Sequence, residues 1–470
     1  MPENKTLNIR NPQGLSFDFL ENGLIKSIDV DPIRVSIKNA TSFSKSGANL
    51  YLRKKTKPCE YKVLLGPESN SRFKIKGNTF IAEGSWCGLD YVCILQLSEK
   101  SLSWQWSIEI NNASNAAVEL DLIYVQDAGL KRNSDALINE YYVGQYLERL
   151  ILEDENYGSV ICCRQNFKDP IGSPWLMMVC KNSATSASVD GIQFYGKTFR
   201  ETGIPEGLIA DKLGGECSGE LSILALQEKP FILAVNKNHK SVFVTTYLQD
   251  HALATSEEDL VQLSTLMLEF DDKDSTQNSR ELLFSSDKNI FNTSVLLPVN
   301  DLNNEDINRF FGKDRRYREV ENGQLLSFFY GQNNHIVLRA KEVLVDRPHG
   351  HIMQAKTGYT PDENIVSTTT YAFGVFNSHL TQGNTNFNCF LSICSSQFNL
   401  ETQTGQRIFI VIDGQRYLLG IPSAFEIGLN HCRWIYKHNN HYFQVRSWTS
   451  KKGPQVNMDF KVISLSLIHI

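Results

Sequence analysis

The amino-acid sequence predicts an all-β protein built from two antiparallel β-sandwiches that are joined by a short helical linker. Apolar and polar residues alternate in several segments, tight-turn dipeptides separate these segments, and helical patterns are rare. The chain has 470 residues, which is too many for a single hydrophobic core. We therefore expect two large β domains rather than one.

Strand-like alternation is clearest in the first half of the chain. In "SWQWSIEI" (103–110), two Trp and two Ile residues alternate with Ser, Gln and Glu, which is typical of a strand with one buried face. The segment "VELDLIY" (118–124) repeats the pattern. Both segments predict strands of an antiparallel sheet.

Hairpin turns are predicted by short dipeptides that lie between apolar runs. Asn and Gly are favoured there because they tolerate the left-handed backbone conformation of a two-residue hairpin turn. The predicted turns are Asn22-Gly23, Gly77-Asn78, Asn322-Gly323, Asp413-Gly414 and Asn439-Asn440.

Two helices are predicted, and the second one lies near the domain boundary. Thr255 and Glu258 have the spacing of a capping box and open the segment "DLVQLSTLMLEF", whereas "NNEDINRFFG" (303–312) predicts a short helix that ends at Gly312. The segment 271–306 is polar and rich in turn residues. We divide the chain into a first sandwich at 1–290, a linker at 291–314 and a second sandwich at 315–463.

Composition and charge exclude several classes of function. The chain is 41% hydrophobic and 21% charged, with a net charge of −5, which gives no reason to expect a nucleic-acid or membrane partner. No segment approaches the roughly 18 apolar residues of a membrane span, and the polar N-terminus does not resemble a signal peptide. The ten cysteines lack metal-ligand spacing, so we expect free, mostly buried thiols and a cytoplasmic location.

One segment matches a nucleotide-binding motif by its letters alone. "GIQFYGKT" (191–198) fits the phosphate-loop pattern and would give Lys197 and Thr198 phosphate-binding roles. Bulky residues fill the loop, however, and Gly203 and Pro205 follow where a phosphate-binding helix would have to continue. We therefore expect a plain strand and turn there, with no nucleotide site.

Three polar motifs in the second half of the chain carry groups that could bind sugars or could form hydrogen bonds within the protein itself. "RPHGHI" (347–352) places two imidazoles on one face of an extended segment; they could bind hydroxyl groups, hold a metal with His335 and His379, or be structural. "GNTNFN" (383–388) and "GQR" (405–407) add amide and guanidinium donors around an aromatic ring. Amides and glycines are also common in β-loops, so a purely structural role stays open.

A series of motifs runs in order along most of the chain. The motifs are "YVGQYLE" (142–148), "RQN" (164–166), "PWLM" (174–177), "DGIQFYG" (190–196), "DHALATSEEDL" (250–260), "RPHGHI", "YAFGVFNSHLTQGNTNFN" (371–388), "GQRIFI" (405–410) and "PSAFEIGLNHCRWIY" (422–436). Together they resemble the N-terminal part of glycoside phosphorylases of glycoside hydrolase family 94, the cellobiose phosphorylase group, and the similarity runs from about 14 to 462. Within that family the chain resembles the long members that act on β-1,2-linked glucooligosaccharides.

The resemblance implies a fold and an activity. It implies supersandwich domains of the galactose-mutarotase type, followed in such enzymes by an (α/α)6 barrel that holds the catalytic acid and the phosphate site. This sequence has no run of alternating long helices, so we expect the barrel to be missing, no catalytic residue in this chain and no activity from it alone. The parent enzyme would transfer a glucosyl unit between a β-glucooligosaccharide and inorganic phosphate, its co-substrate, without a metal or other cofactor.

The resemblance also guides the choice of carbohydrate-binding candidates, all in the second sandwich, which joins the barrel in such enzymes. These are His349, His351, Asn384, Asn386, Arg407 and Trp434. Two alternatives stay open: a stand-alone carbohydrate-binding β-sandwich protein, and a piece of a cyclic β-1,2-glucan synthase. The last six residues, "LSLIHI" (465–470), are also encoded by the end of a common transposon sequencing adapter, so we expect them to be foreign and the second sandwich to be incomplete.

Overall fold

The computed structural model describes residues 7–37, 39–44, 47–135, 143–217, 219, 221–270, 282–284, 289–355, 363–383, 390–391 and 404–464. These residues form two units. The first unit comprises Met1–Gly196 and Ile204–Asn292, and the second comprises Lys197–Gly203 and Thr293–Ile470. The seven-residue segment Lys197–Gly203 therefore belongs to the second unit although the chain on both sides of it belongs to the first.

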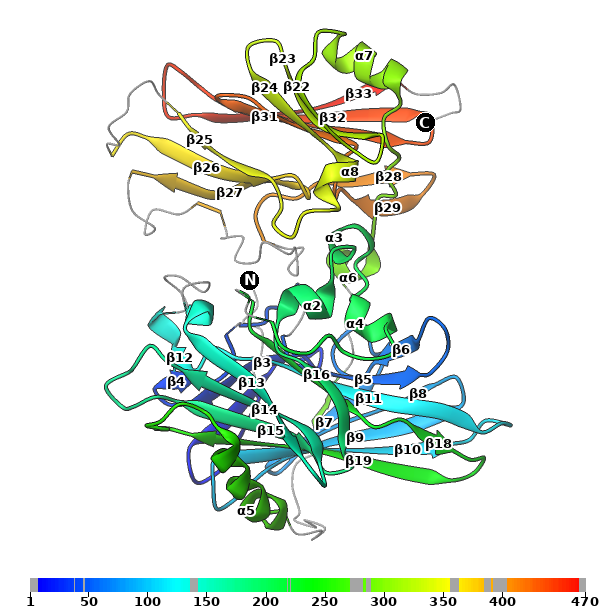
Figure 1. The fold of residues 1–470 in the computed structure, drawn as a ribbon, viewed down its shortest axis with the longest axis vertical. Coiled ribbons are helices and arrows are strands. Elements are labelled where there is room, and N and C mark those ends of the chain that lie inside the picture. Colours follow the sequence, from blue (N-terminus) through cyan, green and yellow to red (C-terminus); the bar gives the residue numbers. More distant parts are fainter. Residues whose placement is uncertain are drawn as a thin grey trace. The chain divides into compact units, whose positions relative to one another are not determined.

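The first unit is a sandwich of a small and a large β-sheet (Figure 1). The small sheet has the order β1 (Leu7–Arg10), β2 (Leu15–Phe19), β3 (Ile25–Val30), β4 (Ile33–Arg34) and β12 (Lys131–Arg132). The large sheet follows the order β20 (Leu282–Phe284), β7 (Arg72–Lys76), β8 (Thr79–Trp86), β9 (Leu89–Leu97), β10 (Ser103–Asn112), β19 (Asn238–Leu248), β15 (Trp175–Cys180), β14 (Gly158–Gln165), β16 (Ala184–Ser188), β17 (Ile223–Glu228), β11 (Val118–Asp127), β5 (Asn49–Lys54) and β6 (Glu60–Val63). Two further strands pair at its side, β13 (Leu147–Asp154) with β14 and β18 (Phe231–Leu233) with β11.

Aromatic side chains fill the core between these two sheets. Phe17 of β2 meets Trp104 of β10 edge to face at 5.5 Å, and the ring of Phe19 stacks on that of Phe80 at 4.1 Å. Trp104 and Trp106 are fully buried, as the alternation in 103–110 predicts. Burial of such aromatic surface is the main favourable term for folding this unit.

The second unit is built on one seven-stranded antiparallel sheet. Its order is β22 (Arg316–Glu321), β23 (Gln324–Tyr330), β24 (Asn334–Leu338), β30 (Ala424–Ile427), β31 (His431–His438), β32 (His441–Thr449) and β33 (Val456–Ser464). Two three-stranded sheets accompany it. They are β25 (Gly350–Gln354), β26 (Val366–Tyr371) and β27 (Val375–Gln382), and β21 (Val295–Leu296), β29 (Gln415–Leu418) and β28 (Phe409–Ile412).

The two faces of the seven-stranded sheet are covered differently. One face, with Trp434 and Phe425, packs against residues of the smaller sheets such as Phe376. The other face packs against helix α7 (Asn304–Phe311) through Ile307 and Phe311 (Figure 1). The helix predicted in the linker is therefore part of the second unit and covers one side of its sheet.

Most local predictions are confirmed. All five predicted turns connect paired neighbouring strands: β2–β3, β7–β8, β22–β23, β28–β29 and β31–β32. Helix α7 begins after Asn303, whose side chain accepts a hydrogen bond from Asp306 N, and it ends at Gly312. The side-chain geometry at Asn303 and Asp306 is a capping box, which satisfies backbone N–H groups that the first helical turn leaves unpaired.

The predicted capping box at Thr255 is wrong by one residue. The box is formed by Ser256 and Asp259, and it opens a 3₁₀ turn (Glu257–Val261) that continues into α5 (Gln262–Leu268). The Thr255 hydroxyl instead accepts a hydrogen bond from Trp175 Nε1 at 3.1 Å. Because Thr255 is held against a core tryptophan, the next residue takes the capping role.

The prediction of a strand in the segment 191–198 is also wrong, because residues 191–195 are helical, whereas residues 197–198 form a turn. Asp190 caps the short helix α2 (Gly191–Tyr195), and α3 (Phe199–Thr202) follows and ends at Gly203. A third short helix, α4 (Glu206–Ile209), comes next, and α6 (Ile290–Thr293) lies at the boundary between the units. Within the described residues, no helix is long and apolar enough to cross a membrane.

The cysteines of the described residues are free thiols. Cys87 and Cys217 are exposed, and the other six are buried. Burial raises the pKa of the Cys163 thiol to about 12; the nearby Arg149 opposes this shift, and Glu148 adds to it. Such thiols are protonated at neutral pH and poorly nucleophilic.

Candidate functional site

Two histidines, one glutamate and one arginine of the second unit lie close together. They meet where helix α8 and strand β25 approach each other. Helix α8 (Arg339–Glu342) follows β24 directly, and the chain then returns to start β25 at Gly350. A Cβ atom at Gly350 would lie 2.8 Å from Thr370 O, so only glycine allows β26 to approach this closely. We call Arg200, His335, Glu342 and His349 the His349 cluster.

Glu342 is the buried centre of the His349 cluster. Its carboxylate Oε2 lies 2.7 Å from His349 Nδ1 and 3.2 Å from the His349 backbone N–H, which donates to it. Arg200 Nη2 donates to the Glu342 carbonyl oxygen at 3.1 Å and also to Val345 O, and Nη1 lies 3.8 Å from Glu342 Oε1. Both Glu342 and Arg200 are only 2% exposed, so their charges compensate each other away from solvent.

Burial lowers the pKa values of two members of the His349 cluster, Arg200 and His335. Burial lowers the pKa of the Arg200 guanidinium, and Glu342 and Asp346 oppose the shift. Burial is the main cause that lowers the pKa of His335, and the nearby His349 and Lys341 lower it further. The His335 ring stacks on Phe329 at 4.6 Å and lies 6.2 Å from the ring of His349. The cluster therefore favours a neutral imidazole at His335, which can donate and accept hydrogen bonds.

The turn at Tyr371–Phe373 connects three of the predicted binding residues. The indole Nε1 of Trp434 donates to Tyr371 O at 3.1 Å, and Ala372 N donates to His349 O at 2.9 Å. The Tyr371 and Phe373 rings stack at 5.4 Å, and the guanidinium of Arg407 lies 5.7 Å from the Phe373 ring. His349, Arg407 and Trp434 are thus brought to one turn although they span 86 positions of the sequence.

Of the remaining predicted residues, one lies on β25 and two lie outside the described residues. His351 pairs with Thr370 of β26, and its Nε2 atom lies 3.2 Å from Leu429 O. Asn384 and Asn386 lie outside the described residues. Trp434 is fully buried, so in this structure its indole supports the turn at Tyr371 and does not present a face to solvent. Carbohydrate binding by these residues stays a prediction.

Two of the predicted binding residues keep part of their side chains exposed. They are His349 and Arg407, whose nitrogen atoms can form hydrogen bonds. Within the described ranges, no three His, Cys, Asp or Glu side chains are placed to share a metal ion. Sequence reasoning missed Glu342 because nothing in the local pattern indicates that α8 turns its last residue toward His349.

The segment that resembles a phosphate loop uses its lysine for other contacts. Lys197 Nζ lies 3.1 Å from Asp346 Oδ1 and donates to Leu344 O at 3.1 Å. The residue before the motif, Asp190, is a buried acid that caps α2, and its side chain accepts from Ile192 N at 2.9 Å. A buried carboxylate occupies this helix start, which repels an incoming phosphate rather than binding it.

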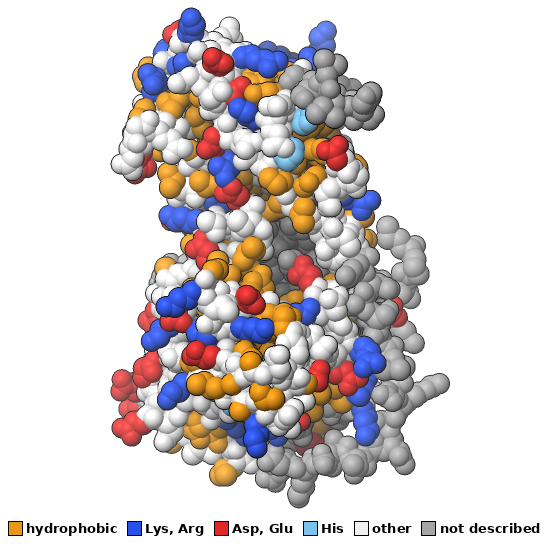
Figure 2. Space-filling view, turned by 90° about the vertical axis from the view of Figure 1, so that its right-hand side faces the viewer, with side chains coloured by type: hydrophobic (Ala, Val, Ile, Leu, Met, Phe, Trp, Pro, Cys, Tyr) orange, Lys and Arg blue, Asp and Glu red, His pale blue; other side chains and the backbone are white. Residues whose placement is uncertain are grey.

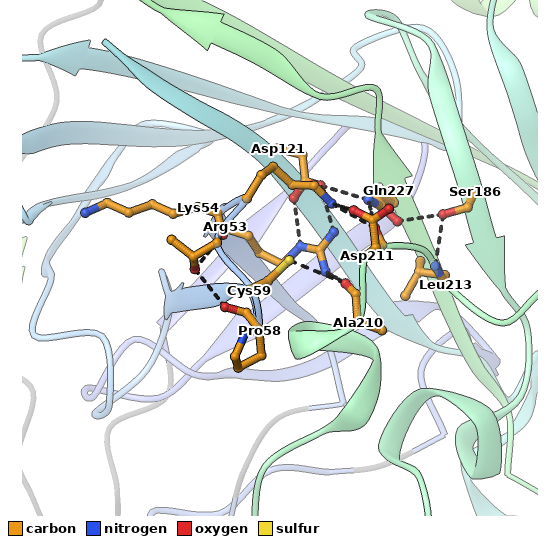
Figure 3. Close-up of polar contacts among 12 residues, drawn as sticks. Arg53, Lys54, Pro58, Cys59, Asp121, Ser186, Ala210, Asp211, Leu213 and Gln227 are labelled. Carbon is orange, nitrogen blue, oxygen red and sulfur yellow. Dashed lines mark hydrogen bonds and ion pairs between the residues drawn. The ribbon is translucent and has the colours of Figure 1, made fainter. Parts of the chain in front are cut away.

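A second buried charge cluster lies in the first unit and is structural. Arg53 and Asp121 face each other on β5 and β11, and their bidentate pair has N–O distances of 2.7 Å (Figure 3). Arg53 also donates to Ala210 O, and Gln227 Nε2 donates to Asp121 Oδ2 at 2.8 Å. Both charged side chains are 0% exposed, so the pair ties the sheet to the loop after α4 and is closed to ligands.

Charges on the described surface are mixed in sign. On the face shown in Figure 2, Lys and Arg side chains are interspersed with Asp and Glu side chains. In the area that this view shows, such a surface does not create a strong electrostatic potential of one sign.

Comparison with known proteins identifies the class and then the family. Residues 313–466 match the glycoside phosphorylase supersandwich domain, and residues 18–245 match the SOGP N-terminal domain. These two matches place the chain among proteins that carry glycoside phosphorylase domains. More narrowly, the chain belongs to the SOGP (1,2-beta-oligoglucan phosphorylase) family, of which it carries the N-terminal and supersandwich domains.

One curated protein and two solved structures are similar to the chain in different degrees. A 1,2-beta-oligoglucan phosphorylase of Listeria innocua serovar 6a is 28% identical over 356 residues, which is 75% of this chain and 31% of that protein. The chain thus spans about a third of the length of this relative. Among solved structures, a bacterial glucoamylase complexed with acarbose is 12% identical (TM-score 0.36; 56% of this chain, 36% of that chain). A putative kojibiose phosphorylase from the human microbiome is 10% identical (TM-score 0.29; 55% of this chain, 32% of that chain).

Proposed function

We propose that this chain supplies the non-catalytic β domains of a phosphorylase that acts on β-1,2-linked glucooligosaccharides. One observation carries the proposal: two SOGP-type domains match in order over 18–245 and 313–466, and the Listeria innocua relative that the chain matches bears the name 1,2-beta-oligoglucan phosphorylase. The chain covers 31% of that relative, which leaves most of its length for a catalytic part.

The reaction of the complete enzyme would be an inverting phosphorolysis. An acid would protonate the glycosidic oxygen while inorganic phosphate attacks the anomeric carbon from the opposite face, which yields α-glucose 1-phosphate from a β-linked chain. We place the acid and the phosphate site in the (α/α)6 barrel that follows these domains in the family. His349 and Glu342 of this chain resemble an acid–base dyad, but the Glu342 carboxylate also accepts from the His349 backbone N–H and lies beside Arg200.

We assign the His349 cluster and Arg407 a supporting role at the edge of the sugar site. Arg407 Nε donates to Thr404 O at 2.9 Å, and its guanidinium lies over Phe373, so its direction is fixed before any ligand arrives. His349 is oriented by Glu342 in the same way. Preorganised donors of this kind bind a hydroxyl group with little loss of side-chain entropy.

The test is oligosaccharide binding by the chain itself. Isothermal titration with β-1,2-, β-1,3- and β-1,4-linked glucooligosaccharides should give millimolar affinity at best, on the order of 4 kcal/mol, for the β-1,2 series. His349→Ala and Arg407→Ala should each weaken it, whereas the control His438→Ala, whose Nδ1 bonds to Pro298 O, should not. Equal binding of all linkages, or tight binding unaffected by both variants, would favour an independent carbohydrate-binding protein.

A further inference from the structure

A short segment from the first half of the chain belongs to the second unit. It comprises Lys197–Gly203, includes α3, and is flanked on both sides by residues of the first unit. We call it the α3 segment. The chain turns into and out of it at Gly196 and Gly203, whose φ angles of 73° and 71° suit glycine. The motif that resembles a phosphate loop therefore ends inside a segment that packs in the second unit.

Three charged side chains of the α3 segment contact residues 339–346, which contain α8 and the turn after it. The partners are Asp346 and Leu344 O for Lys197, Val345 O and Glu342 for Arg200, and Arg339 for Glu201. These partners occur in reverse order along the sequence, so the two stretches run in opposite directions. Opposite charges face each other in each pair, and a shift by one pair would place Glu201 against Glu342. The charge pattern therefore favours one alignment of the α3 segment.

Arg200 is the buried member of these contacts. Its side chain is 2% exposed, whereas the side chains of Lys197 and Asp346 are 51% and 57% exposed. Nη2 of Arg200 donates to Glu342 O at 3.1 Å and to Val345 O, and Nη1 lies 3.8 Å from Glu342 Oε1. Exposed ion pairs contribute little to stability, whereas a buried guanidinium needs its protein partners because water cannot replace them. The docking of the α3 segment therefore depends mainly on Arg200.

Arg200 and His349 are connected through Glu342. The two carbonyl oxygens that Arg200 binds belong to the last residue of α8 and to the turn that leads toward His349. The carboxylate of the same Glu342 accepts from the His349 backbone N–H and lies 2.7 Å from Nδ1. Arg200 thus contacts both the backbone and the side chain of residue 342. Because Nδ1 of His349 is engaged, Nε2 is the ring nitrogen that remains for a ligand.

We propose that Arg200 is a positioning residue for His349. By docking the α3 segment against residues 339–346, it holds Glu342 in the orientation that directs the His349 imidazole. A segment that lies within the matched N-terminal domain, 18–245, thus completes the candidate site of the second unit. The contribution of His349 to sugar binding rests on the proposed function, whereas its orientation through Arg200 and Glu342 does not.

The tautomer of His349 tests the positioning. The Glu342 carboxylate needs a donor at Nδ1, so the neutral imidazole should be the Nδ1–H tautomer. Long-range ¹⁵N–¹H spectra of the full chain with labelled histidine report this, and His349→Ala assigns the signal. Arg200→Met removes the docking contacts and should give a mixture of tautomers. Arg200→Lys keeps the charge but not the planar fork of donors, and should do the same. The matched control Lys197→Ala removes exposed contacts of the same segment and should leave the tautomer unchanged.

His431 in the same unit shows whether a variant stays folded. Its Nε2 lies 3.1 Å from Glu426 Oε1, so it should keep the Nε2–H tautomer in each variant. A change at His349 without a change at His431 supports the proposal. Where Arg200→Met unfolds the unit and changes His431 as well, Arg200→Lys decides. A His349 tautomer that is unchanged in Arg200→Lys, or that changes equally in Lys197→Ala, would overturn the proposal.

Oligosaccharide binding tests the step that rests on the proposed function. In titrations with β-1,2-linked glucooligosaccharides, Arg200→Lys and His349→Ala should each weaken binding about fivefold, the effect of one hydrogen bond. The double variant should bind no more weakly than His349→Ala alone, because both changes act on one imidazole. Additive losses would show that Arg200 acts independently of His349 and would overturn its positioning role at the sugar site. If the tautomer responds as expected in a chain that binds no glucooligosaccharide, the positioning of His349 stands and its proposed role in sugar binding is refuted.

Discussion

The Nδ1 atom of His349 lies 2.7 Å from Oε2 of Glu342, a carboxylate that is only 2% exposed and also lies beside the buried guanidinium of Arg200. This contact fixes the direction of the imidazole of the residue that precedes strand β25. Glu342 thus connects the end of α8 with the residue before β25 and with Arg200.

Replacing Glu342 with Gln should therefore destabilise the second unit. The variant keeps the shape but leaves the buried Arg200 without a negative partner, so we expect the free energy of unfolding to fall by about 2 kcal/mol. Urea unfolding followed by tryptophan fluorescence measures it. The control Asp346→Asn removes a half-exposed partner of Lys197 and should cost about 0.5 kcal/mol or less. Equal losses in both variants would contradict a central role for Glu342.

His335 should make the stability depend on pH. Its pKa in the folded state is lowered, mainly by burial, below the ordinary value of about 6.5. As the pH falls below about 6.5, the unfolded chain takes up a proton that the folded chain resists, and stability is lost until the lowered folded-state pKa is reached. Between pH 7.5 and pH 5, His335→Asn should thus lose less stability than the wild type. His379, whose pKa is also lowered by burial, remains in both proteins. Identical pH slopes would show that His335 titrates normally.

Breaking the buried Arg53–Asp121 pair of the first unit should lower the free energy of unfolding by a larger amount. Asp121→Asn should lower the free energy of unfolding by about 3–5 kcal/mol, because it leaves Arg53 charged and fully buried. Thermal unfolding of the chain measures this, and Asp211→Asn, which changes a largely exposed carboxylate in the same cluster, should leave stability nearly unchanged. A mild effect at Asp121 would mean that Gln227 and the carbonyl groups around Arg53 suffice to hold it.

Thiol reactivity should divide the cysteines by burial. Cys87 and Cys217 are exposed, whereas burial raises the pKa of Cys163 and Cys432 to about 12. When the native chain reacts with a chromogenic disulfide, the C87S/C217S variant should show two fewer fast-reacting thiols than the wild type. The Cys163→Ser variant should show the same number as the wild type. Fast reaction at Cys163 would indicate that β14 opens readily.

The local features of the fold were predictable because each is encoded by neighbouring residues. The alternation of Trp104, Trp106, Ile108 and Ile110 and the turn dipeptides depend only on spacing, and all are confirmed. The capping box moved from Thr255 to Ser256 because a tertiary hydrogen bond from Trp175 claims the threonine. Tertiary contacts of this kind have no local signal.

For the same reason, the contacts within the candidate site could not be predicted from the sequence. Arg53 and Asp121 are 68 positions apart and meet only because β5 and β11 pair in one register. Glu342 meets His349 through the path of a loop, and Trp434 contacts Tyr371 across two sheets. The residue types of the site were predictable, whereas their partners required the pairing of strands that are distant in sequence.

The most direct test of the proposed role is release of glucose 1-phosphate from β-1,2-glucooligosaccharides and inorganic phosphate. We would compare residues 1–464 alone with the product of the gene's reading frame followed past codon 464. The account predicts no turnover by residues 1–464 and formation of the α-anomer by the longer protein, because our proposal places the catalytic acid and the phosphate site outside the two β domains. Turnover by residues 1–464 alone, or an immediate stop codon, would contradict the account, and a β-configured product would contradict the single displacement.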